Sequence, residues 1–173
     1  MKKGYVHVYT GNGKGKTTAM LGLTLRASGA GLRTYIGQFI KNGEYCEVKS
    51  IKKYLPCVKI EQYGTSSALI NRDVTEKDIE AAQNGLRIAS EAMFSGEYDV
   101  VMLDEINIAI YYNLISVDSV IELIKKKPCN IELVLTGRHA AEEIIEAADL
   151  VSEVTEIKHY YDDNIEAREG IEK

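Results

Sequence analysis

The chain lacks any uninterrupted apolar run long enough to span a membrane. Residues 1–16 carry several lysines but no apolar stretch of the kind found in signal peptides. We therefore expect a cytoplasmic protein with no membrane partner.

An excess of positive charge is also missing. The chain has 21 Lys and Arg against 26 Asp and Glu, which gives a formal net charge of −5. Proteins that bind nucleic acids present broad basic surfaces, so we expect no nucleic-acid partner. A local basic pocket is still compatible with this composition.

Cysteine is scarce and its spacing is uninformative for metal binding. The three cysteines are Cys46, Cys57 and Cys129, and none forms a Cys-x-x-Cys pair. We interpret them as reduced, structural thiols. No histidine stands at a spacing that would complete a metal site with them.

What the sequence does contain is a regular alternation of strands and helices within 173 residues, a length that suits one domain, 1–173. We expect strands at 5–9, 33–40, 58–63, 99–103, 131–135 and 150–157. We expect helices at 15–30, 44–54, 75–93, 117–126 and 140–148. The inner strands are continuous apolar runs, which indicates an α/β fold with a mostly parallel sheet and helices on both faces.

Two further expectations concern the first helix and the C-terminal tail. Apolar residues lie on most faces of the helix expected at 15–30, which predicts a buried helix. The tail from Asp162 to Lys173 is highly charged, which predicts a loosely held segment.

A glycine-rich loop follows the first expected strand and precedes the first expected helix. It reads Thr10, Gly11, Asn12, Gly13, Lys14, Gly15, Lys16, Thr17, Thr18. The usual phosphate-binding pattern is G-x-x-x-x-G-K-S/T. The end of that pattern fits, but its first glycine should stand where Thr10 is found.

This loop has the chemistry for phosphate binding. Its backbone N–H groups can turn towards phosphate oxygens, Lys16 can neutralise phosphate charge, and Thr17 can ligate Mg²⁺. A plain glycine turn is a poor explanation for two lysines, three glycines and a Thr pair in this context. A dinucleotide fingerprint also fits poorly, because Lys16 occupies its third glycine position. We predict a P-loop NTPase-like (RecA-like) fold and leave open whether the nucleotide is ATP.

A pair of carboxylates, Asp104-Glu105, ends the apolar strand at 99–103. Ligands of open α/β sheets bind at the carboxyl edge, where such groups can hold Mg²⁺ or act as a base. The alternative is an acidic cap on the following helix. Beside a phosphate loop the metal role is the better interpretation, with a small preference for Glu105 as the direct ligand.

Three further polar residues follow strand ends and are candidate nucleotide contacts. Arg138 suits a polyphosphate, although an ion pair with Glu142 or Glu143 explains it equally well. Gln38 and Lys41 flank the end of the second expected strand. These residues predict a nucleotide-binding, Mg²⁺-dependent α/β protein. They leave hydrolysis, phosphoryl transfer and another use of ATP open.

Several stretches together resemble the ATP:corrinoid adenosyltransferases of the cobalamin pathway. They are TGNGKGKTT (10–18), RASGAGLR (26–33), GQFIKNGE (37–44), YDVVMLDEIN (98–107), ELVLTGRHA (132–140), ADLVSEVTEIKH (148–159) and Gly170-Ile171-Glu172. The resemblance implies transfer of the adenosyl group of ATP to the Co(I) of a reduced corrinoid, with release of triphosphate. It also implies that the loop holds ATP in an orientation unlike that in P-loop hydrolases.

The resemblance further implies roles for individual residues and partners. Lys16 and Glu105 take catalytic roles, residues 11–18 hold the nucleotide, and Thr17 and Glu105 match metal-associated positions. ATP and Mg²⁺, or Mn²⁺, are the implied cofactors, the corrinoid is the second substrate, and a flavoprotein is the implied electron donor. A homodimer is also implied. The alternatives are a P-loop ATPase or small-molecule kinase, or a non-catalytic protein that binds adenosylcorrinoid.

The sequence departs from the family after Tyr63-Gly64. Some members carry aromatic residues there that face the corrinoid, whereas this chain has Thr65-Ser66-Ser67. Tyr63 is the aromatic residue nearest to that position and the candidate to replace them.

Overall fold

The computed structural model describes residues 2–65 and 73–172. Its strands are β1 (Val6–Thr10), β2 (Thr34–Gln38), β3 (Val58–Gln62), β4 (Val100–Asp104), β5 (Glu132–Thr136) and β6 (Leu150–Glu153). Its helices are α1 (Lys16–Gly29), α2 (Cys46–Tyr54), α3 (Glu76–Phe94), α4 (Ile106–Tyr111), α5 (Val117–Lys126), α6 (Glu142–Ala147) and a 3₁₀ turn, η1 (Tyr160–Asp163).

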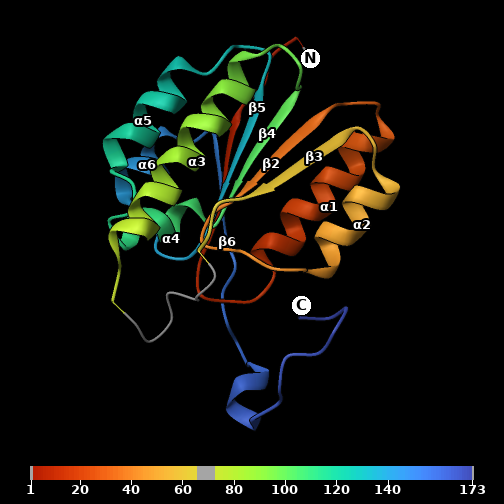
Figure 1. The fold of residues 1–173 in the computed structure, drawn as a ribbon, viewed down its shortest axis with the longest axis vertical. Helices are drawn as coiled ribbons and strands as arrows, with labels where there is room; N and C mark the ends of the chain where they lie inside the picture. Colours follow the sequence, from red (N-terminus) through yellow and green to blue (C-terminus); the bar gives the residue numbers. More distant parts are fainter. Residues whose placement is uncertain (1, 66–72, 173) are drawn as a thin grey trace.

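The six strands form one sheet in the order β3-β2-β4-β5-β1-β6. Every pairing among the described strands is parallel, so the α/β prediction is confirmed and the sheet is more uniformly parallel than expected. Parallel strands need crossover connections, and helices provide most of them, on both faces of the sheet (Figure 1). All six carboxyl ends therefore lie at one edge.

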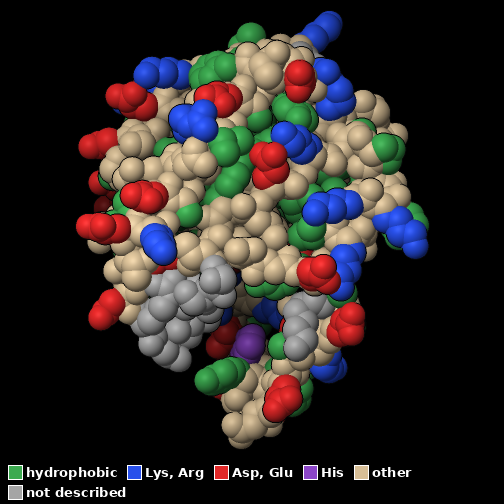
Figure 2. Space-filling model, in the orientation of Figure 1, with side chains coloured by type: hydrophobic (Ala, Val, Ile, Leu, Met, Phe, Trp, Pro, Cys, Tyr) green, Lys and Arg blue, Asp and Glu red, His purple; other side chains and the backbone are tan. Residues whose placement is uncertain are grey.

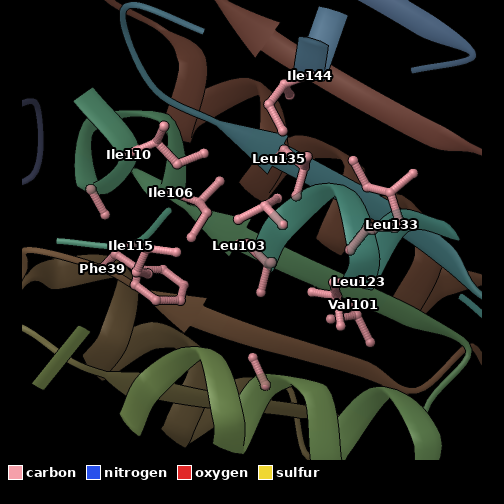
Figure 3. Packing of buried hydrophobic residues seen from close by; sticks show 14 of the residues in the cluster. Phe39, Val101, Leu103, Ile106, Ile110, Ile115, Leu123, Leu133, Leu135 and Ile144 are labelled. Atoms are coloured by element: carbon pink, nitrogen blue, oxygen red, sulfur yellow. The ribbon is translucent and has the colours of Figure 1, made fainter. Parts of the chain in front are cut away.

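Helices divide between the two faces according to the alternation of strand side chains. Val101 and Leu103 of β4 point to the face covered by α3, α4, α5 and α6, where they join a large apolar cluster (Figure 3). Val100 and Met102 point to the opposite face and pack with Met20 of α1 and residues of α2. Burial on both sides explains why the inner strands read as continuous apolar runs.

Local signals place several helix ends. The Thr75 side chain and Asp78 form the capping box expected at the start of α3. Ser116 accepts a hydrogen bond from the Ser119 amide at the start of α5. The end of α1 falls at Gly29, and Gly31 follows in the left-handed region with φ of 76°.

The expectation that α1 is buried all round was wrong. Its buried residues are Lys16, Met20, Thr24 and Ala27, whereas Leu25 is 64% exposed. The helix therefore covers the sheet with one face, as a surface helix does. The last expected strand, 150–157, is shorter than predicted, and the helix α4 and turn η1 were not anticipated.

Beyond β6 the chain leaves the body of the molecule and forms a separate C-terminal segment (Figure 1). On the face drawn in Figure 2, acidic and basic side chains are interspersed rather than gathered into a broad basic surface. In the described part of the chain, no helix combines the length and the apolar character needed to cross a bilayer. The three cysteines are free thiols, as expected.

Candidate active site

The strand register brings the predicted polar residues together at the carboxyl edge. Gln38 of β2 stands beside Asp104 of β4, and β5 ends next to β4 at Thr136. Thr10 ends β1 on the other side of β5, and the glycine loop starts there. The phosphate loop and the acidic pair, far apart in sequence, therefore share one edge.

Asp104 is the hub of this edge. It is completely buried, and four side chains donate hydrogen bonds to its carboxylate. Thr17 and Thr136 donate to Oδ1 at 2.9 and 2.7 Å. Gln38 and Lys41 donate to Oδ2 at 3.1 and 2.7 Å. A buried charge needs this degree of pairing, and the arrangement ties the loop to three strand ends.

Lys41 supplies the positive charge that balances Asp104. Its side chain is 19% exposed, and its ammonium also donates to the Thr17 hydroxyl at 3.2 Å. Burial is the largest single influence and lowers the pKa of Lys41, but the carboxylates of Asp104, Glu105 and Glu47 together outweigh it, so the pKa is raised. Lys41 is therefore a firmly charged group at this edge.

Lys16 points into the phosphate loop. Its ammonium donates to the backbone oxygens of Gly11 and Gly13, each at 2.7 Å, and the residue is 6% exposed. Burial lowers the pKa of Lys16, and the negative charge of Glu105 partly opposes that shift. An anion in the loop would meet this ammonium directly.

The glycines of the loop are required by the segment that follows β6. The Gly13 amide donates to the Val154 oxygen at 2.7 Å. A Cβ added at Gly11 or Gly13 would lie 2.5 or 2.8 Å from that oxygen. The Gly13 amide is thus engaged by the chain and does not face inward, the orientation in which a loop N–H group could meet a phosphate oxygen.

Thr10 stands where the usual pattern has its first glycine, and it accepts two hydrogen bonds there. It is the last residue of β1, and its hydroxyl accepts a hydrogen bond from the Ala140 amide at 3.3 Å. Its carbonyl accepts from the Val154 amide. The departure from the usual pattern therefore coincides with contacts that join the loop to the segments after β5 and β6.

Glu105 differs sharply from its neighbour. Its backbone is left-handed, with φ of 60°, and its amide donates to the Thr136 hydroxyl at 3.0 Å. Within the described residues its carboxylate accepts no hydrogen bond. Burial, together with the charge of Asp104, raises the pKa of the Glu105 carboxyl, while Lys41 and Lys16 oppose the rise. Glu105 is the carboxylate with capacity for a new ligand.

Backbone strain is concentrated at this edge. Ile40, Glu105 and His139 all have positive φ, between 58 and 64°, and each lies within three residues of the end of a neighbouring strand. This conformation is costly for a residue with a Cβ, and above all for a β-branched one. Such strain is typical of functional sites, because a fold retains it only where the geometry is needed.

Arg138 lies at the rim of the site and is exposed. In the part of the chain that the structure covers, it forms no ion pair with Glu142 or Glu143, the alternative left open by the sequence. Its charge acts on the pKa values of both Lys16 and Glu105. The Asn107 side chain donates to the Gly137 oxygen at 3.4 Å and holds the adjoining turn against α4.

Not every predicted residue joins this cluster. The side chains of Asn12 and Thr18 are exposed and have no hydrogen-bond partner among the described residues. Gln38 is completely buried, so it supports Asp104 from below instead of lining an open surface. Lys14 points away from the loop, towards the C-terminal segment.

Tyr63 does not replace the missing aromatic residues. It is 9% exposed, its ring packs against Phe39, and its hydroxyl shares hydrogen bonds with Tyr35 and Glu61. It therefore presents no ring face to a substrate in this structure. Ser66 and Ser67 lie outside the described residues.

Sequence reasoning missed Thr136 and Asn107. Thr136 ends a strand just as Asp104 does, and that position was the available signal. Asn107 sits on α4, a helix too short to show a period, so no pattern pointed to it.

The donor set fits Mg²⁺ bound mainly through phosphate and water. Among the described residues, no three His, Cys, Asp or Glu side chains come together as a metal site. Mg²⁺ at nucleotide sites commonly uses one or two carboxylates or hydroxyls and completes its shell with phosphate oxygens and water. Thr17 and Glu105 are donors of this kind.

A strand, a glycine loop and a helix, beside a neighbouring strand end that carries two carboxylates, define a P-loop-type nucleotide-binding protein. The profile of ATP:corrinoid adenosyltransferase BtuR/CobO/CobP matches residues 2–172. The chain therefore belongs to the ATP:corrinoid adenosyltransferase family, and the resemblance described above is confirmed.

Relatives found by sequence agree with that assignment. A corrinoid adenosyltransferase from Sinorhizobium sp is 37% identical over 99% of this chain and 81% of its own length. Corrinoid adenosyltransferases from Pseudomonas aeruginosa and Escherichia coli strain K12 are each 31% identical over 99% of this chain, and 84% and 86% of their own lengths. Among solved structures, the genome packaging NTPase B204 from Sulfolobus turreted icosahedral virus 2, in complex with sulfate, matches with a TM-score of 0.46 and 15% identity, covering 90% of this chain and 76% of its own.

Proposed function

We propose that this chain transfers the 5′-deoxyadenosyl group of ATP to the cobalt of a Co(I) corrinoid, which is the second substrate. The cobalt electron pair forms the new bond to the 5′ carbon. The bond between that carbon and its phosphate oxygen breaks, and its electron pair leaves with the triphosphate. The task of the protein is to position the two substrates and to stabilise the departing negative charge.

The hydrogen bonds to Asp104 are the observation that carries this proposal. Its four hydrogen-bond donors tie Thr17 of the phosphate loop to Lys41 after β2. Lys41 is thereby held at the edge of the sheet next to Thr17, and Lys16, the residue before Thr17, is held by the loop carbonyls of Gly11 and Gly13. We propose that Lys16 meets the triphosphate within the loop and that Lys41 and Arg138 face its charge from the rim. Held in place before the reaction, such charges need no reorganisation as the leaving group develops.

For the metal, we propose Thr17 and Glu105 as the protein groups that hold Mg²⁺ or Mn²⁺. A metal ion there would withdraw charge from the triphosphate and help it to leave. Asp104 is proposed to act through Thr17 instead of directly, because each of its oxygens already accepts two hydrogen bonds. The Thr17 hydroxyl oxygen accepts one, from Lys41, and has a second lone pair for a metal. Glu105 has no such competitor among the described residues.

The oligomeric state, the cellular location and the electron donor are also proposals. We propose a homodimer of one-domain subunits in the cytoplasm, with a flavoprotein that reduces the corrinoid. Exposed apolar residues on β6 and after it, among them Leu150, Val151 and Ile157, support an association between copies. Sedimentation equilibrium tests this, since a single species at the 19.2 kDa monomer mass would contradict the dimer.

The role of Lys16 is tested by turnover. Under strong reduction, with ATP, Mg²⁺ and a corrinoid, the wild-type protein should form a light-sensitive cobalt–carbon product. Lys16→Ala should lower kcat by roughly 100-fold or more, the usual loss for one preorganised charge-stabilising group. Lys49→Ala, on the exposed side of α2, removes the same charge outside the site and should react normally. Equal rates in the two variants would refute the role given to Lys16.

A further inference from the structure

The C-terminal segment returns to the phosphate loop and engages its second lysine. The Lys14 ammonium donates to the Glu172 carboxylate at 2.8 Å and to the Ile171 carbonyl oxygen at 3.3 Å. The two lysines of the loop therefore differ in direction. Lys16 points inward, and Lys14 reaches across to the end of the chain.

Glu172 is held by more than Lys14. Arg168 donates through Nε to Oε2 at 3.1 Å and through Nη2 to Oε1 at 3.0 Å, and its backbone amide donates to Oε2 at 2.9 Å. These side-chain hydrogen bonds from Arg168, and then the one from Lys14, hold the pKa of the Glu172 carboxyl well below its usual range. The group is therefore an anion at every working pH.

This arrangement is that of an oxyanion site with an internal anion in it. The guanidinium fork binds a carboxylate and a phosphate in the same two-point geometry. The Lys14 ammonium and the Arg168 guanidinium also lie over the same ring, that of Tyr160, at 5.8 and 5.0 Å from its centre. The two cations thus share one carboxylate and one aromatic ring.

Space for a larger anion adjoins Lys14. A cavity of about 390 Å³ lies between the loop and the C-terminal segment, lined by Lys14, Lys158, His159, Tyr160, Asp163 and Ile165. Lys158 adds a second lysine to its wall, and Asp163 adds a carboxylate. A phosphate bound to Lys14 would therefore have room beside it, and Glu172 is the anion that holds the Lys14 ammonium in this structure.

We propose that Lys14 and Arg168 form an anion subsite that Glu172 fills in this structure and that one phosphate of a triphosphate takes over. This inference rests on the proposed function, in which triphosphate is the leaving group. Displacement of Glu172 would release the C-terminal segment from the loop. Its return would compete with the product and favour triphosphate release. An internal competitor lowers the apparent affinity by the fraction of molecules in which the subsite is open.

The test is a calorimetric titration of the full chain with inorganic triphosphate and Mg²⁺, without corrinoid. Glu172→Gln removes the competing charge and should tighten triphosphate binding about two- to fivefold relative to the control, the range expected for one exposed ion pair. The matched control is Glu166→Gln, which makes the same charge change at an exposed position of the same segment. Unchanged or weaker binding by Glu172→Gln, compared with the control, would overturn the proposal.

A second comparison tests Arg168. In the Glu172→Gln background, Arg168→Ala should weaken triphosphate binding by about three- to tenfold, because the subsite loses its fork. If triphosphate affinity is unchanged in this double variant, Arg168 only binds Glu172 within the C-terminal segment. That result would also overturn the proposal. The titrations need no adenosyl transfer. If the affinities change as expected but no cobalt–carbon product forms, the subsite is supported and the proposed function alone fails.

Discussion

Replacing Lys41 by Met should destabilise the protein through the charge left on Asp104. Two unit charges at the observed separation of 2.7 Å attract by about 6 kcal/mol at an effective dielectric constant of about 20, before desolvation is deducted. Removing one partner of a buried pair costs about 3–5 kcal/mol. Lys41 is 19% exposed and Asp104 keeps three neutral donors, so the lower end applies. We expect a loss of about 3 kcal/mol, or a fall in Tm of about 6–12 °C.

The partner variants separate lost charge from lost packing. In Lys41→Met/Asp104→Asn both charges are gone, so this double variant should be about 1–2 kcal/mol more stable than Lys41→Met alone. Urea unfolding at pH 7, without nucleotide, gives all the free energies needed for the cycle. As a control, Lys49→Met breaks an exposed pair with Glu44 and should cost less than about 1 kcal/mol.

Two results would refute this reasoning. A loss below about 1 kcal/mol for Lys41→Met would mean that Asp104 tolerates burial without a cation. Simple additivity of the single variants would mean that the two side chains do not interact in solution. Either result would remove the ground for treating Asp104 as the hub of the site.

Further predictions concern Glu105 and the loop glycines. The folded protein holds a proton on Glu105 more tightly than the unfolded chain does, because the folded-state pKa is raised. Wild-type stability is therefore lost as pH rises from the unfolded-state pKa of about 4.3 to the raised folded-state pKa. Without metal and nucleotide, Glu105→Gln should therefore unfold at a higher temperature than wild type at pH 7 and match it below about pH 4; a lower Tm at pH 7 would contradict the raised pKa. Gly13→Ala would place a Cβ 2.8 Å from the Val154 oxygen, so we expect ATP affinity measured by calorimetry to fall about tenfold or more. The control is Gly22→Ala in the middle of α1, where the new Cβ would have nothing within 4 Å. It should raise stability by up to about 1 kcal/mol and leave ATP affinity unchanged. Equal ATP affinities in the two variants would contradict a clash between the Cβ added at position 13 and the Val154 oxygen.

The sheet and the edge that carries the site were predictable from the sequence. Apolar strands such as β4 could be recognised because both of their faces are buried, and Thr75 and Asp78 marked the start of α3 through a local capping pattern. Asp104-Glu105 and the glycine loop could be assigned to the same edge because parallel strands share a direction. These inferences depend only on local pattern and on the handedness common to all such sheets.

The unequal roles of the two carboxylates were not predictable. Asp104 is a buried hub, whereas the Glu105 carboxylate accepts no hydrogen bond among the described residues. The chain turns at Glu105, whose backbone is left-handed, and no sequence pattern encodes that turn. The exposure of Leu25 was missed for a related reason, since an apolar residue on a helix does not reveal how much of the helix the sheet covers. The contact between Lys14 and Glu172 joins the two ends of the chain, and only the fold brings them together.

In the proposed reaction the whole triphosphate departs when the adenosyl group moves to cobalt. Quantitative ³¹P NMR of a single-turnover reaction with Mg²⁺-ATP and Co(I) corrinoid tests it directly. We expect one intact triphosphate for each light-sensitive cobalt–carbon bond formed. Orthophosphate released without a cobalt–carbon product would contradict the account and would identify an ATPase instead.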